Sequence, residues 1–348
     1  MKRFFAGMAA AILAAISLFP VKVNALSAEK SILIDGQTGR CLYENRADER
    51  SLIASTTKIM TALVVCEQCN VLDRVRIPKE AVGIEGSSMY LKEDEVLTVQ
   101  ELLYGMMLHS GNDAAMALAI YCGGTAEGFA ELMNDKARAL GMQGSHFENP
   151  HGLDSPGHYS TARDLAILTA YAMENPIFRQ TVSTKQVKVG QRYLKNHNKL
   201  LWRIDGAEGV KTGYTKAAGR ILVSSTCRDG RRLIAVTIHA PDDWNDHKQL
   251  IEKGYREYAV QRIVTKGDNL GNVEVVSGDA QTVSLCARED FFYSLAAGEN
   301  VTVQLPPCPF VYAPIFMGDY AGDGYILLDG TVIGRIPLYY SQTVLETA

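Results

Sequence analysis

Strand-forming segments lie at both ends of a long helical block in the first 260 residues, and this order limits the possible folds most. Residues 31–44, "SILIDGQTGRCLYE", contain two β-rich runs around a Gly-Gln-Thr-Gly turn. β-Rich runs return at residues 208–215, 219–227 and 231–240. A sheet must bury its apolar face against another layer, so we expect the early and late strands to meet in one sheet covered by helices. The predicted fold class is α/β (α+β).

The intervening segments have apolar residues at helical spacing. In residues 55–69, Ile59, Leu63 and Cys66 would share one side of a helix. The same reading applies to a further set of segments, at residues 98–108, 111–122, 126–142, 161–174 and 246–260. We therefore predict one domain of sheet and helices over residues 26–262.

The pattern of apolar and turn-forming residues changes near Arg262. Short β-rich runs then alternate with Gly, Asp and Pro turns, as in "NVTVQLP" and "GYILLDGTVIGRIPL". We interpret residues 263–348 as a separate, small all-β domain.

The first 25 residues have the pattern of a signal peptide. Lys2 and Arg3 precede an apolar run from Phe4 to Phe19, which is followed by a short polar stretch ending at Ala25. The run is shorter than the ~20 residues of a membrane-spanning helix. We expect cleavage after Ala25 and secretion across the cytoplasmic membrane to the cell envelope; the alternative is an uncleaved N-terminal anchor.

Charge and cysteine content argue against several functions. The chain has 35 Lys and Arg against 39 Asp and Glu, and three of its cations lie in the predicted signal peptide. An acidic mature chain is a poor ligand for nucleic acid. The seven cysteines include the pair Cys66 and Cys69, but no second Cys or His pair of matching spacing accompanies it. We interpret the cysteines mostly as buried apolar residues and predict no metal and no cofactor.

The stretch "IASTTKIM" places Ser55 three residues before Lys58. On a helix the two side chains would lie on one face, within reach of each other. A neutral lysine could then take the serine proton and make the hydroxyl a nucleophile. Only about four in ten thousand ordinary lysines are neutral at pH 7, so burial or a second cation must lower the pKa of Lys58. Alone, the pair is more typical of a capping serine and a surface lysine.

Two further motifs follow in the chain. "HSGND" contains Ser110 and Asn112, whose hydroxyl and amide could both face a cleft, although both residue types also commonly cap helices. "KTGYT", residues 211–215, lies on a predicted strand and contributes Lys211 as a second cation.

Serine-x-x-lysine, Ser-x-Asn and Lys-Thr-Gly in this order form the signature of penicillin-binding proteins and class A β-lactamases. Together with "NPHGLDSPGHYSTARDLA" and "GAEGVKTGYTKAAGRILVSS", they make the chain resemble the low-molecular-weight penicillin-binding proteins that are serine-type D-alanyl-D-alanine carboxypeptidases. The resemblance covers the mature chain. It implies an antiparallel sheet covered by helices, followed by a small β-rich domain.

The resemblance also implies catalytic roles for residues of the first two motifs. Ser55 would attack the carbonyl of the penultimate D-alanine, and Lys58 would be its general base. Ser110 and Asn112 would transfer protons and position the substrate. The substrate would be a peptidoglycan stem peptide ending in D-Ala-D-Ala, and β-lactam antibiotics would acylate Ser55 as covalent inhibitors.

The third motif would bind the substrate. Lys211, Thr212 and Thr215 would receive the terminal carboxylate. The N–H groups of Ser55 and Tyr214 would form the oxyanion hole. Gly213 would let another segment of backbone approach closely.

The sequence departs from the family in two places. The family often carries an arginine shortly after the last strand of the sheet, whereas the corresponding "APDDWNDHKQ" has none. The final residues, "PLYYSQTVLETA", are too short and too mixed to predict the membrane-binding amphipathic helix of many relatives.

Two alternative functions remain. A class A-like β-lactamase would need a glutamate that activates water, and Glu148 is the tempting candidate between the second and third motifs. A non-catalytic peptidoglycan-binding protein would be free to lose Ser55 or Lys58, and this chain has both.

Overall fold

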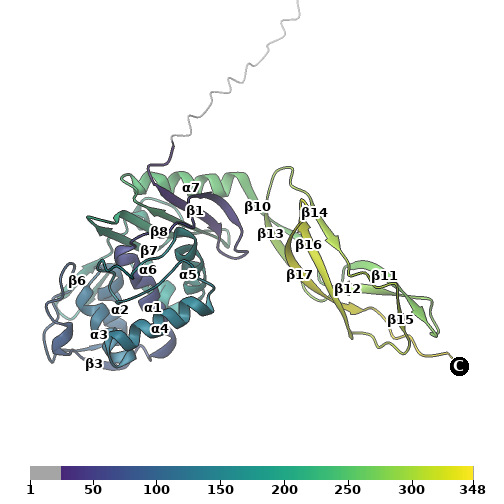
Figure 1. Cartoon of the computed structure of the whole chain (residues 1–348), viewed down its shortest axis with the longest axis horizontal. Helices are drawn as coiled ribbons and strands as arrows, with labels where there is room; N and C mark the ends of the chain where they lie inside the picture. The colour runs from purple at the N-terminus through teal and green to yellow at the C-terminus, as the bar shows by residue number, and fades with distance from the viewer. Residues whose placement is uncertain (1–24, 348) are drawn as a thin grey trace, which may run out of the picture.

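The computed structural model describes residues 25–347 and is shown in Figure 1. The predicted signal peptide lies outside the described residues except for Ala25. The helices are α1 (Lys58–Gln68), α2 (Val99–Leu108), α3 (Asn112–Gly123), α4 (Ala126–Ala139), α5 (Ala162–Glu174), α6 (Pro176–Ser183) and α7 (Asp243–Glu257). Three short 3-10 helices accompany them, η1 (Ala54–Thr57), η2 (Lys79–Ala81) and η3 (Lys199–Trp202).

Strands precede, interrupt and follow the helical block. The strands before α7 are β1 (Lys30–Asp35), β2 (Cys41–Asn45), β3 (Arg74–Arg76), β4 (Val96–Thr98), β5 (Gln186–Val189), β6 (Arg192–Lys195), β7 (Ala207–Thr215), β8 (Gly219–Arg228) and β9 (Arg231–Ile238). Those after α7 are β10 (Tyr258–Val264), β11 (Asn269–Val276), β12 (Thr282–Ala287), β13 (Phe291–Ala296), β14 (Val301–Gln304), β15 (Phe310–Tyr312), β16 (Tyr320–Leu328) and β17 (Thr331–Tyr340).

The first five-stranded sheet joins the two ends of the helical block. Its strand order is β2-β1-β9-β8-β7, and every neighbouring pair is antiparallel. β1 pairs with β9 from Lys30↔Ile238 to Asp35↔Leu233. The prediction that early and late strands meet in one helix-covered sheet is therefore confirmed. β7, which carries the Lys-Thr-Gly motif, is an edge strand.

Both faces of this sheet are covered. Along β9, Ile234 and Val236 belong to the cluster under the helical block, whereas Leu233 and Ala235 pack with Leu250 of α7. This alternation follows from the two-residue period of a strand. Figure 1 shows α7 along one side of the sheet and the remaining helices gathered on the other.

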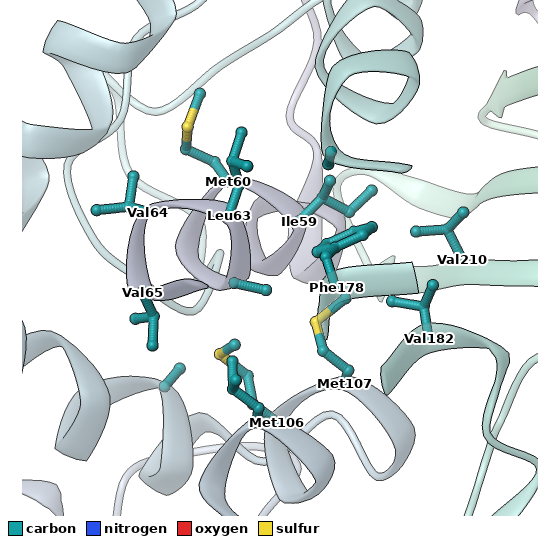
Figure 2. Close-up of a cluster of buried hydrophobic side chains, with 14 of the residues drawn as sticks. Ile59, Met60, Leu63, Val64, Val65, Met106, Met107, Phe178, Val182 and Val210 are labelled. Carbon is teal, nitrogen blue, oxygen red and sulfur yellow. The ribbon is translucent and has the colours of Figure 1, made fainter. Parts of the chain in front are cut away.

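Helix α1 is the centre of the helical block. Its residues from Lys58 to Val65 are all buried. Figure 2 shows the apolar side chains around it, which come from α1, α2, α6 and β7: Ile59, Met60, Leu63, Val64, Val65, Met106, Met107, Phe178, Val182 and Val210. The start of α1, and with it Lys58, is thus fixed by packing on all sides.

The chain after α7 forms an all-β region, which Figure 1 shows as an elongated body beyond the end of α7. β10 pairs with β13, and a six-stranded sheet has the order β14-β16-β17-β12-β11-β15 around its own apolar cluster.

The predicted helix over residues 246–260 is wrong at its end, because α7 stops at Glu257 and Tyr258 begins β10. Pairing with β13, about thirty residues later, overrides the local helical pattern. The predicted boundary at Arg262 falls inside β10 and stays a prediction.

Polar contacts join the two regions. The buried Asp35 carboxylate accepts a hydrogen bond from the Ser294 hydroxyl at 2.5 Å and pairs with Arg231 at 3.1 Å. Arg40 pairs with Glu299. Among residues 25–347, no helix combines the length and apolarity required to cross a membrane.

Candidate active site

Ser55 lies at the turn that precedes α1. It belongs to η1, and Lys58 is the first residue of α1. Ala54 has a positive φ of 44°, which is uncommon for a residue with a Cβ. The N-cap of α1 is Thr57, and neither η1 nor α1 has a side-chain cap. The alternative of a capping serine and a surface lysine does not describe this site, because Lys58 is fully buried.

The Lys58 amine contacts three oxygen atoms. Its Nζ lies 3.0 Å from Ser55 Oγ, 2.6 Å from Asn112 Oδ1 and 2.7 Å from the carbonyl oxygen of His151. A neutral amine has two N–H groups and one lone pair. The amide and peptide carbonyl oxygens can only accept, so they match the two N–H groups and leave the lone pair for the Ser55 hydroxyl proton.

Burial holds the pKa of Lys58 well below its ordinary value of 10.5, and the positive charge of nearby Lys211 lowers it further. Asp113 opposes this shift. Burial also lowers the pKa of Lys211, to about 7. Desolvation and a second nearby cation are the two effects that can lower the pKa of Lys58 enough to make the amine neutral, and both are present here.

The loop before α3 brings Ser110 and Asn112 to the same place. Gly111, not Ser110 or Asn112, is the N-cap of α3, and it makes no side-chain cap. Ser110 has a positive φ of 66°, a strained conformation for serine. Asn112 Nδ2 donates to the carbonyl oxygen of Glu85 at 2.5 Å, which orients its Oδ1 toward Lys58. Both polar side chains therefore face the site instead of capping the helix.

Lys211 approaches the site from β7. Its side chain is buried, and Nζ donates to Ser110 Oγ at 3.0 Å and to the carbonyl oxygen of Thr212 at 2.8 Å. Ser110 thus touches Lys211, while Asn112 touches Lys58. One short loop connects the two lysines.

Gly213 is required by the close approach of β7 to η1. A Cβ at this position would lie 3.2 Å from the carbonyl oxygen of Ile53 and 3.3 Å from the backbone nitrogen of Ser55. The segment that carries Tyr214 therefore runs directly beside the Ser55 backbone. Because β7 is an edge strand, its N–H groups that do not pair with β8 are directed outward.

The two threonines of the third motif lie in different surroundings. Thr212 lines a cavity of about 870 Å³ together with Ser55, Ser110, Gly213 and Tyr214. Thr215 does not line that cavity. Its hydroxyl donates to Asp154 Oδ1 at 3.1 Å and accepts a hydrogen bond from the N–H of Ala218 at 3.0 Å.

Glu148 lies away from this cavity. It is exposed, and its carboxylate accepts hydrogen bonds from the Ser155 hydroxyl and from the Gly157 N–H at 3.2 Å. The Ser155 hydrogen bond lowers the pKa of Glu148, so the side chain is an ordinary ionised loop carboxylate. Glu148 therefore does not provide the water-activating glutamate that a β-lactamase would need.

Three contributors to the site have no obvious signal in the sequence. His151 acts through its carbonyl oxygen, which no motif reveals. Asp113 is buried behind Asn112, where its carboxylate binds the N–H groups of Met89, Leu91 and Ala114. Arg220 lines the cavity from β8 opposite Tyr214, and only the register of the β7–β8 hairpin could have placed it there.

The described residues contain no group of three or more His, Cys, Asp or Glu side chains arranged to hold a metal ion. The groups gathered around Ser55 are a hydroxyl, two buried amines and an amide. Such a set can activate a nucleophile and bind an anion.

Two family profiles match the chain. That of the D-alanyl-D-alanine carboxypeptidases matches residues 18–242, and that of the penicillin-binding protein 5 C-terminal domain matches residues 258–346. The chain is 31% identical to D-alanyl-D-alanine carboxypeptidase DacF of Bacillus subtilis, over 89% of this chain and 84% of the relative. It is 33% identical to D-alanyl-D-alanine carboxypeptidase DacC of Escherichia coli, over 94% of this chain and 86% of the relative.

Solved structures agree with these matches. Penicillin binding protein 5 from Haemophilus influenzae superposes with a TM-score of 0.81 at 30% identity, covering 94% of this chain and 100% of that one. A mutant of the Streptomyces K15 DD-transpeptidase superposes with a TM-score of 0.65 at 34% identity. This superposition covers 67% of this chain and 99% of the transpeptidase chain.

Proposed function

The chain belongs to the D-alanyl-D-alanine carboxypeptidase family of serine peptidases, and we propose that it removes the terminal D-alanine from peptidoglycan stem peptides through an acyl-enzyme on Ser55. β-Lactams, which mimic the substrate, acylate the same hydroxyl. The enzyme acts in cell-wall biosynthesis outside the cytoplasmic membrane, as the signal-like N-terminus suggests. Residues 26–262 form the catalytic domain, and residues 263–348 form the β-rich domain.

The observation that carries this proposal is the surroundings of the Lys58 amine. Neutral Lys58 takes the proton of Ser55 while Ser55 Oγ forms a bond to the carbonyl carbon of the penultimate D-alanine. Asn112 and the His151 carbonyl oxygen hold the amine in place during this transfer. The negative charge that develops on the substrate oxygen is stabilised by the N–H groups of Ser55 and Tyr214.

Collapse of the tetrahedral intermediate breaks the peptide bond. Lys58 gives up its proton again, and Ser110, which lines the same cavity as Ser55 and accepts a hydrogen bond from Lys211, passes a proton to the nitrogen of the leaving D-alanine. Water then attacks the acyl-enzyme, with Lys58 again as the base, and releases the shortened peptide.

The terminal carboxylate of the substrate is received by Lys211 and Thr212. The cavity that Thr212 shares with Ser55 supports this assignment. Thr215, which the sequence motif also suggests for the carboxylate, is hydrogen-bonded to Asp154 in the absence of substrate.

The test is incubation with a synthetic peptide ending in D-Ala-D-Ala, followed by measurement of free D-alanine. We expect release by the wild-type protein and none by Ser55→Ala. After labelling with a fluorescent penicillin, peptide mass spectrometry should find the adduct on the peptide that contains Ser55. An adduct on another serine would overturn the assignment of the nucleophile.

A further inference from the structure

Arg220 uses only part of its guanidinium in bonds to the protein. Its Nη2 donates to Oδ1 of Asp243 at 2.7 Å and to Oδ2 at 2.9 Å. Within residues 25–347, Nε and Nη1 have no hydrogen-bond acceptor. The side chain is 43% exposed and lines the same cavity as Ser55, so these free donors belong to a group that ligands can reach.

The carboxylate that holds Arg220 is itself fixed. Asp243 is the first residue of α7 and is buried. Its pKa is raised by burial, and the Arg220 charge opposes that shift. The Arg220 guanidinium also lies 5.7 Å from the ring centroid of Trp244, within the range of a cation–π contact. Arg220 therefore has a defined position on the cavity wall before any ligand binds.

The register of the β7–β8 hairpin places Arg220 near the proposed carboxylate site. Arg220 lies opposite Tyr214, and Thr212 is two positions before Tyr214 on the same strand. Residues at these diagonal positions have side chains on one face, within reach of a long side chain. A carboxylate held by Thr212 would be within reach of the free donors of Arg220.

The cavity around Arg220 is rich in positive charge. It is also lined by Lys195, Lys199 and Arg203, none of which forms an ion pair within the described part of the chain. Asp243, already bound to Arg220, is the one carboxylate among the lining residues. In a chain of net negative charge, this collection of cations would concentrate anions at the site.

We propose that Arg220 binds the terminal carboxylate of the substrate together with Thr212, and that Asp243 positions Arg220 for this contact. The inference rests on the proposed carboxypeptidase function and names a specificity residue for it. The planar guanidinium suits a carboxylate because two of its N–H groups can donate side by side.

The experiment compares two peptide substrates that differ only in the charge of the C-terminal group. One is a diacetyl-lysyl-D-Ala-D-Ala peptide, and the other is the same peptide with a C-terminal amide. Wild type should prefer the acid. Arg220→Met should lower kcat/KM for the acid by about 10- to 100-fold and for the amide by less than about threefold, because only the acid loses a charged hydrogen bond.

Three further variants make the result specific. Arg220→Lys should restore part of the preference, since lysine keeps the charge but loses the paired donors. Asp243→Asn should reduce the preference, because Arg220 then loses its fixed position. Arg74→Met removes an exposed arginine that does not line the cavity and should leave the ratio of acid to amide unchanged.

The outcomes separate this inference from the proposed function. No release of D-alanine by the wild-type protein would overturn the carboxypeptidase proposal itself. An active wild type with no preference for the acid would overturn carboxylate binding by Arg220 and by Lys211. An unchanged preference in Arg220→Met would overturn the role of Arg220 alone. If Arg220→Met does not fold, the wild-type ratio and Arg220→Lys still decide.

Discussion

Lys58 and Asn112 are 54 positions apart in the chain, yet Nζ of Lys58 lies 2.6 Å from Oδ1 of Asn112. The contact joins the start of α1 to the start of α3, and both helices are packed in the same apolar cluster. Asn112 is in turn held by the carbonyl oxygen of Glu85. The buried amine therefore has a fixed partner that cannot take its proton, which keeps the lone pair available for Ser55.

The two lysines predict the pH dependence of acylation. Lys58 must be neutral to act as a base, so the rate should fall as the pH drops through its lowered pKa. Lys211→Ala removes a neighbouring positive charge, which should raise the pKa of Lys58 and move the acidic limb of the profile to higher pH. The measurement is the rate of penicillin acylation against pH in both proteins. An acidic limb that stays in place would remove the electrostatic part of this mechanism.

Gly213→Ala should impair acylation with little loss of stability. The added Cβ would press on the Ile53 carbonyl oxygen and the Ser55 nitrogen, and would force β7 away from η1. A displaced oxyanion hole should lower the acylation rate by roughly 10- to 100-fold. Stopped-flow acylation and thermal unfolding would measure both effects, with the exposed Lys216→Ala as the control. Normal acylation in Gly213→Ala would show that the close approach is not needed.

Deacylation should distinguish this enzyme from a β-lactamase. Glu148 is bound within its own loop, so no glutamate is assigned to activate water on the penicilloyl adduct. We expect steady turnover of D-Ala-D-Ala peptide and a long-lived penicillin adduct in the same protein. Glu148→Gln should change either rate by no more than about threefold. Intact mass after removal of excess penicillin gives the adduct lifetime, and rapid clearance that Glu148→Gln abolishes would favour the β-lactamase.

The β-rich region should be dispensable for the chemistry. All three motifs lie before α7, and 67% of this chain is enough to match 99% of the K15 relative. A protein spanning residues 26–262 should still be labelled by penicillin, at a lower unfolding midpoint because Asp35 loses Ser294 and Arg40 loses Glu299. A variant ending at Glu257 is a useful companion, since it leaves no unpaired β10. A folded but unreactive truncation would mean that the second region shapes the site.

Buried histidines predict a loss of stability in mild acid. Burial lowers the pKa of His247 and His151 to about 3 and that of His158 to about 4. In the unfolded chain these groups bind protons near pH 6.5, so the unfolded state is favoured as the pH falls below that value. Each histidine contributes up to about 1.4 kcal/mol per pH unit in this range. Urea unfolding at pH 7 and pH 5 measures the effect, and equal stability at both would contradict it.

The sequence alone determined the fold class, the return of strands after the helical block, and the family. Strand and helix periodicities are local, and the spacing of Ser55 and Lys58 already predicts that their side chains meet. The three motifs also predict a second cation near Lys58, which the structure provides as Lys211. These inferences succeed because each depends either on residues that are neighbours in the sequence or on motifs whose order along the chain is a known signature.

Only the tertiary structure decided which distant groups surround the catalytic pair. The His151 carbonyl oxygen reaches Lys58 because its loop packs on η1, where a Cβ at Gly152 would clash with the Ala54 carbonyl oxygen. Thr215 turns to Asp154, and Arg220 enters the cavity through the register of β7 and β8. The physical reason is common to all of these contacts. Each depends on backbone atoms or strand register, which are set by packing between remote segments and leave no pattern in the residues nearby.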